Sequence, residues 1–189
     1  MWYEVECKVK IRDYLSLKKK VKALGIFKYK TLKRDEYFSL KKKGYPKKAF
    51  RVRDDDGSFI VNFKKHVRSL SNPDVVVKEE FEFSIKDKNE LSNFMSLCED
   101  LGFREWVSKT KESEVYSYTK DKHLSIELNK VRGLGYWMEV EYLCSRKDIP
   151  KAKSLIKSVL KELEIMKVDI NNEGYTKMLY EHKKRKING

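Results

Sequence analysis

The segment Glu4-Val5-Glu6-Cys7-Lys8 alternates charged and apolar side chains near the start of the chain. Successive side chains of a β-strand point to opposite faces, so Glu4, Glu6 and Lys8 share one face while Val5 and Cys7 share the other. The alternation therefore predicts a strand with one charged and one apolar face. The charged face must therefore lie in a polar environment, separate from the apolar core.

The same alternation recurs along the chain, in short clusters at 51–53, 62–64, 78–82, 109–111 and 139–141. The cluster at 109–111 is the weakest strand prediction, because Ser108 and Thr110 interrupt its apolar face. In phase with these clusters, one face collects acids and bases together: Glu4, Glu6, Glu80, Glu82, Glu127, Glu139 and Glu141 with Lys8, Arg51, Arg53, Lys64, Lys78, Lys109 and Lys111. The alternate positions are largely apolar.

The charged face could lie in either of two environments. One is bulk water; the other is the lumen of a closed or strongly curved sheet whose apolar outside is covered by helices. Lysine and glutamate ladders on a wet surface would give the same charge balance, but they do not need arginines spaced as Arg51 and Arg53. Arginine presents a fixed fork of donors that suits phosphate oxygens, whereas grouped carboxylates suit hard cations such as magnesium or manganese. The combination favours a site for a metal-bound polyphosphate.

These residues resemble those of the CYTH, or triphosphate tunnel metalloenzyme, superfamily, which includes class IV adenylate cyclases and thiamine triphosphatases. The opening signature is Glu4-x-Glu6-x-Lys8. The resemblance continues, in order, through Asp35-Glu36-Tyr37-Phe38, Arg51 and Arg53, Lys64, Glu80 and Glu82, Lys109, Tyr116, the Gly133-Leu134-Gly135-Tyr136-Trp137 turn, and Glu139 with Glu141. It implies an α+β fold, a closed or nearly closed antiparallel β-barrel (the triphosphate tunnel) with covering helices on the outside. Residues 1–182 are expected to form a single domain, and residues 183–189 a basic, frayed tail.

The resemblance also implies roles for individual residues. Catalysis is expected from Glu4, Glu6, Lys8, Glu80 and Glu82. Triphosphate binding is expected from Lys8, Arg51, Arg53, Lys64, Lys78, Lys109 and Lys111. The expected ligands of Mg2+ or Mn2+ are Glu4, Glu6, Glu127, Asn129, Glu139 and Glu141.

The chain departs from the family pattern at three of these positions. Asn129 stands where the family usually has aspartate, and an amide is a poorer metal ligand than a carboxylate; Glu127, on the same strand face, is a possible substitute. Lys78 and Lys111 stand where arginines are expected, so two bidentate phosphate contacts become point charges. These departures bear on activity and metal affinity more than on the fold.

Three functions fit the pattern. The first is hydrolysis of a triphosphate, whether inorganic, thiamine or nucleoside triphosphate, which ranks first because it demands no recognition of base or ribose. The second is class IV adenylate cyclase activity, which converts ATP to cyclic AMP and pyrophosphate. The third is a polyphosphate- or RNA-binding module of low activity, suggested by Asn129, Lys78, Lys111 and the net charge.

Composition is consistent with these hypotheses. The 189 residues are 40% hydrophobic, enough for one sizeable core. The 43 Lys and Arg residues against 29 Asp and Glu residues give a net charge of +14, which attracts polyanions nonspecifically. No stretch approaches the ~18 apolar residues of a membrane helix, and the first residues lack a signal-peptide pattern, so a cytoplasmic protein without membrane contact is expected. Family members often dimerise, which makes a homodimer possible.

Apolar stripes predict three helices that cover the sheet. One ends at Gly25, and a second runs from Leu91 to Gly102 with Phe94, Met95, Cys98 and Leu101 on its buried face. The third begins near Pro150, with Asp148 as its possible cap. The cysteines Cys7, Cys98 and Cys144 are odd in number and far apart, which indicates neither a disulfide framework nor a zinc site; Cys7 and Cys98 are expected in the core.

Overall fold

The computed structural model describes residues 2–40, 43–46, 48–55 and 58–188. The strands of this part of the chain are β1 (Trp2–Lys10), β2 (Gly25–Ser39), β3 (Phe50–Asp55), β4 (Ser58–His66), β5 (Val76–Ile85), β6 (Arg104–Tyr118), β7 (Leu124–Val131) and β8 (Gly135–Cys144). The α-helices are α1 (Tyr14–Leu24), α2 (Lys88–Asp100), α3 (Ile149–Glu162) and α4 (Tyr175–Asn188). Every cluster of alternating charge thus falls on a strand, including the weakly predicted one in β6.

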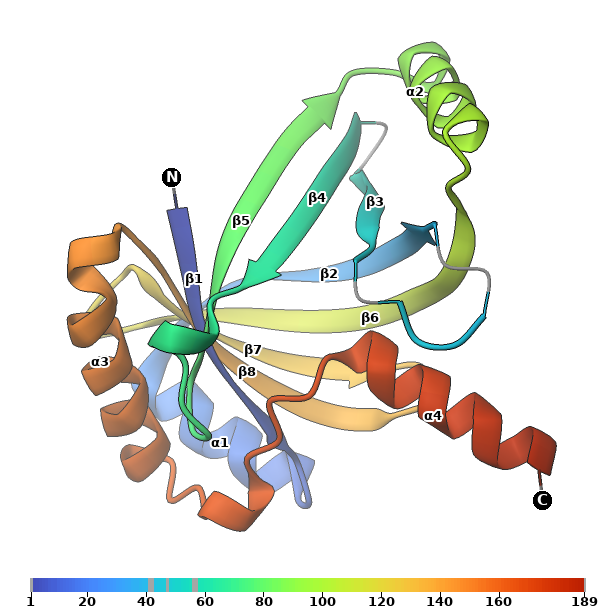
Figure 1. The fold of residues 1–189 in the computed structure, drawn as a ribbon. Coiled ribbons are helices and arrows are strands. Elements are labelled where there is room, and N and C mark those ends of the chain that lie inside the picture. Colours follow the sequence, from blue (N-terminus) through green and yellow to red (C-terminus); the bar gives the residue numbers. More distant parts are fainter. Residues whose placement is uncertain (1, 41–42, 47, 56–57, 189) are drawn as a thin grey trace.

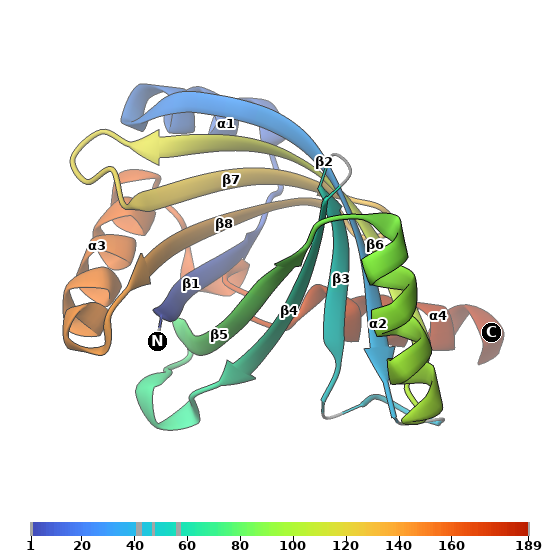
Figure 2. The same ribbon diagram turned by 90° about the horizontal axis from the view of Figure 1, so that it is seen from above.

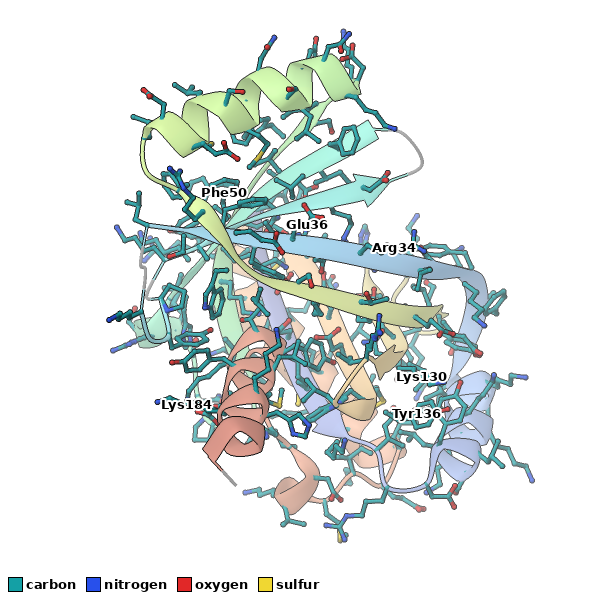
Figure 3. The ribbon with its side chains drawn as sticks, turned by 90° about the vertical axis from the view of Figure 1, so that its right-hand side faces the viewer. Arg34, Glu36, Phe50, Lys130, Tyr136 and Lys184 are labelled. Atoms are coloured by element: carbon teal, nitrogen blue, oxygen red, sulfur yellow. The ribbon has the colours of Figure 1, made fainter. Side chains whose placement is uncertain are left out.

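The described strands close into one antiparallel barrel in the order β1-β5-β4-β3-β2-β6-β7-β8, with β8 returning to β1 (Figures 1 and 2). This confirms the closed barrel that the resemblance to the CYTH superfamily implies. Because the barrel has an inside and an outside, the period-2 pattern sorts charged residues to the lumen and apolar residues to the outer face. On β1, for example, Glu4, Glu6 and Lys8 line the lumen, while Val5, Cys7 and Val9 pack in the core under the helices. Where no helix covers the sheet the outer residues are polar too: on β2, Asp35 is buried while its neighbours Arg34 and Glu36, labelled in Figure 3, are exposed.

Helices α1 and α3 cover one side of the barrel and α2 lies on the opposite side (Figure 2). The larger core contains Val5, Cys7 and Val9 of β1 packed with residues of α1, α3, β7 and β8. A smaller core lies between the strands β2, β3, β4 and β5 and the helix α2. It contains Phe38 and Val52 of the strands, with Phe94 of α2 packed against them. The covering helices are therefore confirmed, and they leave the lumen free.

Two details of the helices differ from the sequence prediction. Leu101 is exposed, and it is the capping residue that follows the last residue of α2, Asp100. Asp148 precedes α3 but makes no capping bond to a backbone amide, since its carboxylate accepts a hydrogen bond from the Ser145 hydroxyl at 2.6 Å. Asp13 and Asp87, by contrast, do cap α1 and α2 with their side chains.

The segment before α4 lies along an edge that β1 leaves open. Strand β5 pairs with β1 only as far as Glu6, and beyond that point Ile170 bridges to Val9. The Asn172 side chain then accepts a hydrogen bond from the Lys8 amide at 2.8 Å. These contacts place the start of α4 at the barrel interior.

Helix α4 then runs past the barrel to Asn188 (Figure 1), so its backbone includes most of the segment expected as a tail. Tyr175, at its first position, packs edge-on against Trp137 of β8 with ring centroids 5.7 Å apart. None of the helices in the described ranges combines the length and hydropathy needed to cross a bilayer.

Candidate active site in the barrel lumen

The lumen holds a cavity of about 530 Å³ lined mainly by charged side chains. Its walls contain every charged residue that the sequence predicted for the site: Glu4, Glu6, Lys8, Arg51, Arg53, Lys64, Lys78, Glu80, Glu82, Lys109, Lys111, Glu127, Glu139 and Glu141. The predicted Asn129 is fully buried beside this cavity. The structure therefore brings together residues that lie up to 137 positions apart in the sequence.

Strand register creates a cluster of three carboxylates in the lumen. Glu6 pairs directly with Glu141 across β1 and β8, and Glu4 lies two residues before Glu6 on the same face. One oxygen from each of Glu4, Glu6 and Glu141 lies within 4.8 Å of the other two. Three carboxylates at this spacing, two buried and that of Glu141 half-buried, match the oxygen-donor preference of Mg2+ or Mn2+. The residues present thus fit a divalent cation.

Lysines from neighbouring strands compensate two of these carboxylates. The Lys78 ammonium contacts Glu4 at 3.1 Å and also contacts Glu6, while Lys64 contacts Glu4. Burial alone would raise the pKa of Glu4, but Lys64 and Lys78 lower it to about 2. Burial, together with the nearby Glu4 carboxylate, raises the pKa of Glu141 well above its ordinary value. Glu141 is therefore the carboxylate whose ionisation would gain most from a bound cation.

A second group of acids is neutralised by the protein itself. The Lys111 ammonium lies 2.7 Å from Glu127 and 2.8 Å from Glu139, and Lys33 lies 2.9 Å from Glu127. Against the effect of burial, Lys111 lowers the pKa of both glutamates to about 2. Asn129 belongs to this group.

Asn129 makes two short hydrogen bonds. Its amide nitrogen donates to Glu139 at 2.8 Å, and its amide oxygen accepts from the Ser113 hydroxyl at 2.6 Å. Both polar ends of the side chain are thus engaged within the protein. The geometry separates Glu127, Asn129 and Glu139 from the Glu4, Glu6 and Glu141 cluster, although the sequence grouped all six as metal ligands.

A third group supplies the basic wall of the lumen. Asp35 accepts hydrogen bonds from Arg53 at 2.6 and 3.1 Å, and the Lys109 ammonium lies 2.8 Å away. Although burial opposes it, Lys109 and then Arg53 hold the pKa of Asp35 far below its ordinary value. Arg51 makes only longer ionic contacts, 3.9 Å to Asp35 and 3.7 Å to Glu82.

Two buried polar side-chain atoms lack a hydrogen-bond partner among the described residues, and both belong to residues that line the lumen. They are Nε of Arg51, from β3, and the hydroxyl of Tyr175, from α4. The Tyr175 ring also packs against the ammonium groups of Lys8 and Lys109, with centroid distances of 4.5 and 5.4 Å. Burial without a partner is costly, so both groups are prepared to donate to an acceptor in the cavity.

Sequence reasoning missed Lys33, Asp35 and Tyr175 as site residues. Lys33 and Asp35 alternate with exposed residues on β2, a pattern that could have placed them on the charged face. Tyr175 gave no comparable signal, because it belongs to a helix that is brought to the lumen only by the contacts of residues 170–172 with β1.

Comparison with known proteins agrees with this geometry. Over 183 residues the chain is 31% identical to a protein of Methanocaldococcus jannaschii that is provisionally named an adenylate cyclase, covering 93% of this chain and 97% of that protein. The chain belongs to the CYTH superfamily. No protein-family model matches the chain.

Solved structures share the CYTH barrel. A protein of Pyrococcus horikoshii superposes with a TM-score of 0.74 at 25% identity, covering 94% of this chain and 98% of its own. A Hippeastrum protein, described as a provisional adenylyl cyclase with a dominant triphosphatase activity, superposes with a TM-score of 0.62 at 16% identity. That match covers 92% of this chain and 91% of the Hippeastrum protein, and it concerns the fold alone.

Proposed function

We propose that this CYTH protein is a divalent-metal-dependent phosphohydrolase that cleaves a triphosphate bound in the barrel lumen. One observation carries the proposal: the carboxylate cluster of Glu4, Glu6 and Glu141 shares a single cavity with two buried donors, Arg51 Nε and the Tyr175 hydroxyl, that lack partners. A ligand that satisfies both must carry acceptor oxygens and tolerate a cation beside them. A polyphosphate has both properties.

The basic wall would bind the phosphates. Arg51 and Arg53 present forked donors, and Lys8, Lys64, Lys78, Lys109 and Lys111 add positive charge around the cavity. Phosphoryl transfer depends mainly on alignment and on stabilising the charge that develops on the oxygens, which this ring of cations provides. The Tyr175 hydroxyl would donate to a phosphate oxygen from the side where α4 begins.

Glu4, Glu6 and Glu141 would hold Mg2+ or Mn2+. When bound, such a cation neutralises phosphate charge and makes an attacking water more acidic. Glu80 would accept a proton from water: Lys64 and a hydrogen bond from Asn62 at 2.7 Å overcome the effect of burial and lower its pKa, so that the carboxylate stays ionised and free to take up a proton. Asn62 also donates to Glu82 at 2.9 Å and so fixes the two carboxylates beside each other.

The second candidate is class IV adenylate cyclase activity. The name of the Methanocaldococcus jannaschii relative favours it, and the same cation and basic wall would serve if the ribose 3′-hydroxyl attacked the α-phosphate. Pyrophosphate would then leave in place of orthophosphate. The third candidate, a polyanion-binding module, would bind without metal and weaken steeply with salt.

The test incubates the purified protein with Mg2+ or Mn2+ and, separately, with tripolyphosphate, thiamine triphosphate and ATP. Orthophosphate, pyrophosphate and cyclic AMP are resolved in each reaction. We expect metal-dependent orthophosphate release, which Glu141→Gln lowers about 100-fold, a loss equivalent to about 2.7 kcal/mol. The matched control is Glu112→Gln, on the exposed outer face of β6, which should leave the rate unchanged.

If ATP yields cyclic AMP and pyrophosphate, the protein is an adenylate cyclase and the proposed hydrolysis is wrong. Tripolyphosphate binding that persists in chelator, without turnover of any substrate, would instead support the binding module.

A further inference from the structure

A second cavity, of about 570 Å³, opens beside the lumen. We call it the ring cavity and define it by its lining residues: Tyr37, Tyr45, Pro46, Ala49, Arg51, Asn62, Lys64, His66, Arg68, Lys78, Trp106 and Thr176. Tyr37, Arg51, Lys64, Lys78 and Thr176 also line the lumen, so the two cavities adjoin each other at these side chains. Its volume is in the range of sites that bind small molecules.

One wall of the ring cavity is aromatic and held in place. Tyr45 and Trp106 meet edge to face with ring centroids 5.1 Å apart, and Tyr180 of α4 packs behind them at 5.9 and 6.3 Å. The Tyr45 hydroxyl lies 3.2 Å from the Thr176 hydroxyl, which joins this wall to the start of α4. Aromatic side chains fixed in this way offer a surface for a planar ring.

The charge of the ring cavity is entirely of one sign. Arg51, Lys64, Arg68 and Lys78 line it, whereas none of its described lining residues carries a carboxylate. Lys64 and Lys78 are paired with glutamates of the lumen, but Arg68 makes no ion pair with a described residue. A cationic ring would therefore meet uncompensated positive charge there, and a neutral ring attached to phosphates would not.

We propose that the ring cavity binds the base of a nucleoside triphosphate whose phosphates occupy the lumen. The inference rests on the proposed function, because it takes the position of the triphosphate from it. Arg51 and Lys64, which line both cavities, would contact the phosphate nearest the ribose, and the base would lie against Tyr45 and Trp106. Thiamine triphosphate fits less well, since its thiazolium ring carries a permanent positive charge.

The experiment compares two dissociation constants, measured by calorimetry in Mg2+ for the non-hydrolysable imido analogues of ATP and of tripolyphosphate. Trp106→Ala should weaken binding of the ATP analogue relative to the tripolyphosphate analogue by about tenfold, the size of one lost stacking contact. Trp106→Phe keeps an aromatic ring, so its ratio of the two dissociation constants should lie close to that of the wild-type protein. The matched control is Tyr136→Ala, an aromatic residue stacked on Tyr14 outside both cavities and labelled in Figure 3, which should leave the ratio unchanged.

A second variant tests the charge argument. Arg68→Glu introduces a carboxylate at the ring cavity and should shift the preference between ATP and thiamine triphosphate about tenfold toward thiamine triphosphate. No shift would overturn the charge argument.

Three results would overturn the inference, and they separate it from the proposed function. If the tripolyphosphate analogue binds but Trp106→Ala leaves the ratio unchanged, the base lies elsewhere and only the inference fails. If neither analogue binds to the wild-type protein, the proposed function fails as well. If a short RNA with a 5′-triphosphate binds about 100-fold more tightly than the ATP analogue, the occupant is an RNA end and not a mononucleotide.

Discussion

Asp35 should act as the internal counter-ion of the basic wall, and replacing it by asparagine tests this reading. Its side chain is fully buried and accepts two hydrogen bonds from Arg53, at 2.6 and 3.1 Å, with the Lys109 ammonium at 2.8 Å. In Asp35→Asn the positive charges remain buried without their partner. Removing one member of a buried ion pair costs about 3–5 kcal/mol, and the retained amide oxygen places the expected loss near the lower end, about 3 kcal/mol.

The assay is urea or thermal unfolding of the two proteins in chelator. For a chain of this length, about 3 kcal/mol corresponds to a fall of roughly 6–12 °C in melting temperature. Tripolyphosphate should restore more stability to Asp35→Asn than to the wild type, since the phosphates replace the missing negative charge and ligand binding stabilises the folded state. The matched control is Glu36→Gln, the exposed neighbour labelled in Figure 3, for which we expect a change below about 0.5 kcal/mol.

The sign of the pH dependence follows from the lowered pKa of Asp35. A carboxylate whose pKa is lower in the folded state contributes its full stability above its unfolded pKa, near 3.9, and loses it as the pH falls toward the folded value. The difference between wild type and Asp35→Asn should therefore be constant at neutral pH and shrink below about pH 4. Equal stability of the two proteins at pH 7 would refute the assignment of Asp35 as counter-ion.

Three further predictions concern single side chains. Asn129→Asp replaces the donor to Glu139 by another acceptor, so we expect a loss of about 2 kcal/mol in chelator, measured by urea unfolding; unchanged stability would contradict the Asn129–Glu139 hydrogen bond. Tyr175→Phe removes an unpartnered hydroxyl and should leave stability intact while weakening tripolyphosphate binding about 5- to 10-fold in calorimetry; equal affinity would show that this hydroxyl does not contact the ligand. Gly135→Ala places a side chain at a φ of +81° and should cost about 1–2 kcal/mol in thermal unfolding, whereas Gly174→Ala, whose new Cβ would make only an ordinary contact with Thr176 Oγ1 at 3.8 Å, serves as the control.

The barrel and most of its lumen residues could be predicted from the sequence, because both follow from a local rule. Alternation of charged and apolar residues, as in Glu4-Val5-Glu6, fixes which side chains share a strand face whatever the rest of the chain does. A charged face repeated on many strands, with arginines at a two-residue spacing, then favoured a polyphosphate site, and the closed barrel followed from the resemblance to the CYTH superfamily. Closure itself, through pairing of β8 with β1, was confirmed only by the structure.

The grouping of the charges was decided by tertiary structure alone. Alternation identifies Glu6, Glu139 and Glu141 as inward residues but says nothing about the register between strands. The register pairs Glu6 with Glu141, which places Glu141 in the carboxylate cluster, whereas Glu139 lies beside the Lys111 ammonium. Contacts of residues 170–172 with β1 likewise bring Tyr175 into the lumen, where no local pattern predicted it. The sequence by itself therefore determined which side chains face inward, because side-chain direction is a property of each strand. Which of them meet depends on how strands and helix pack together over the whole chain.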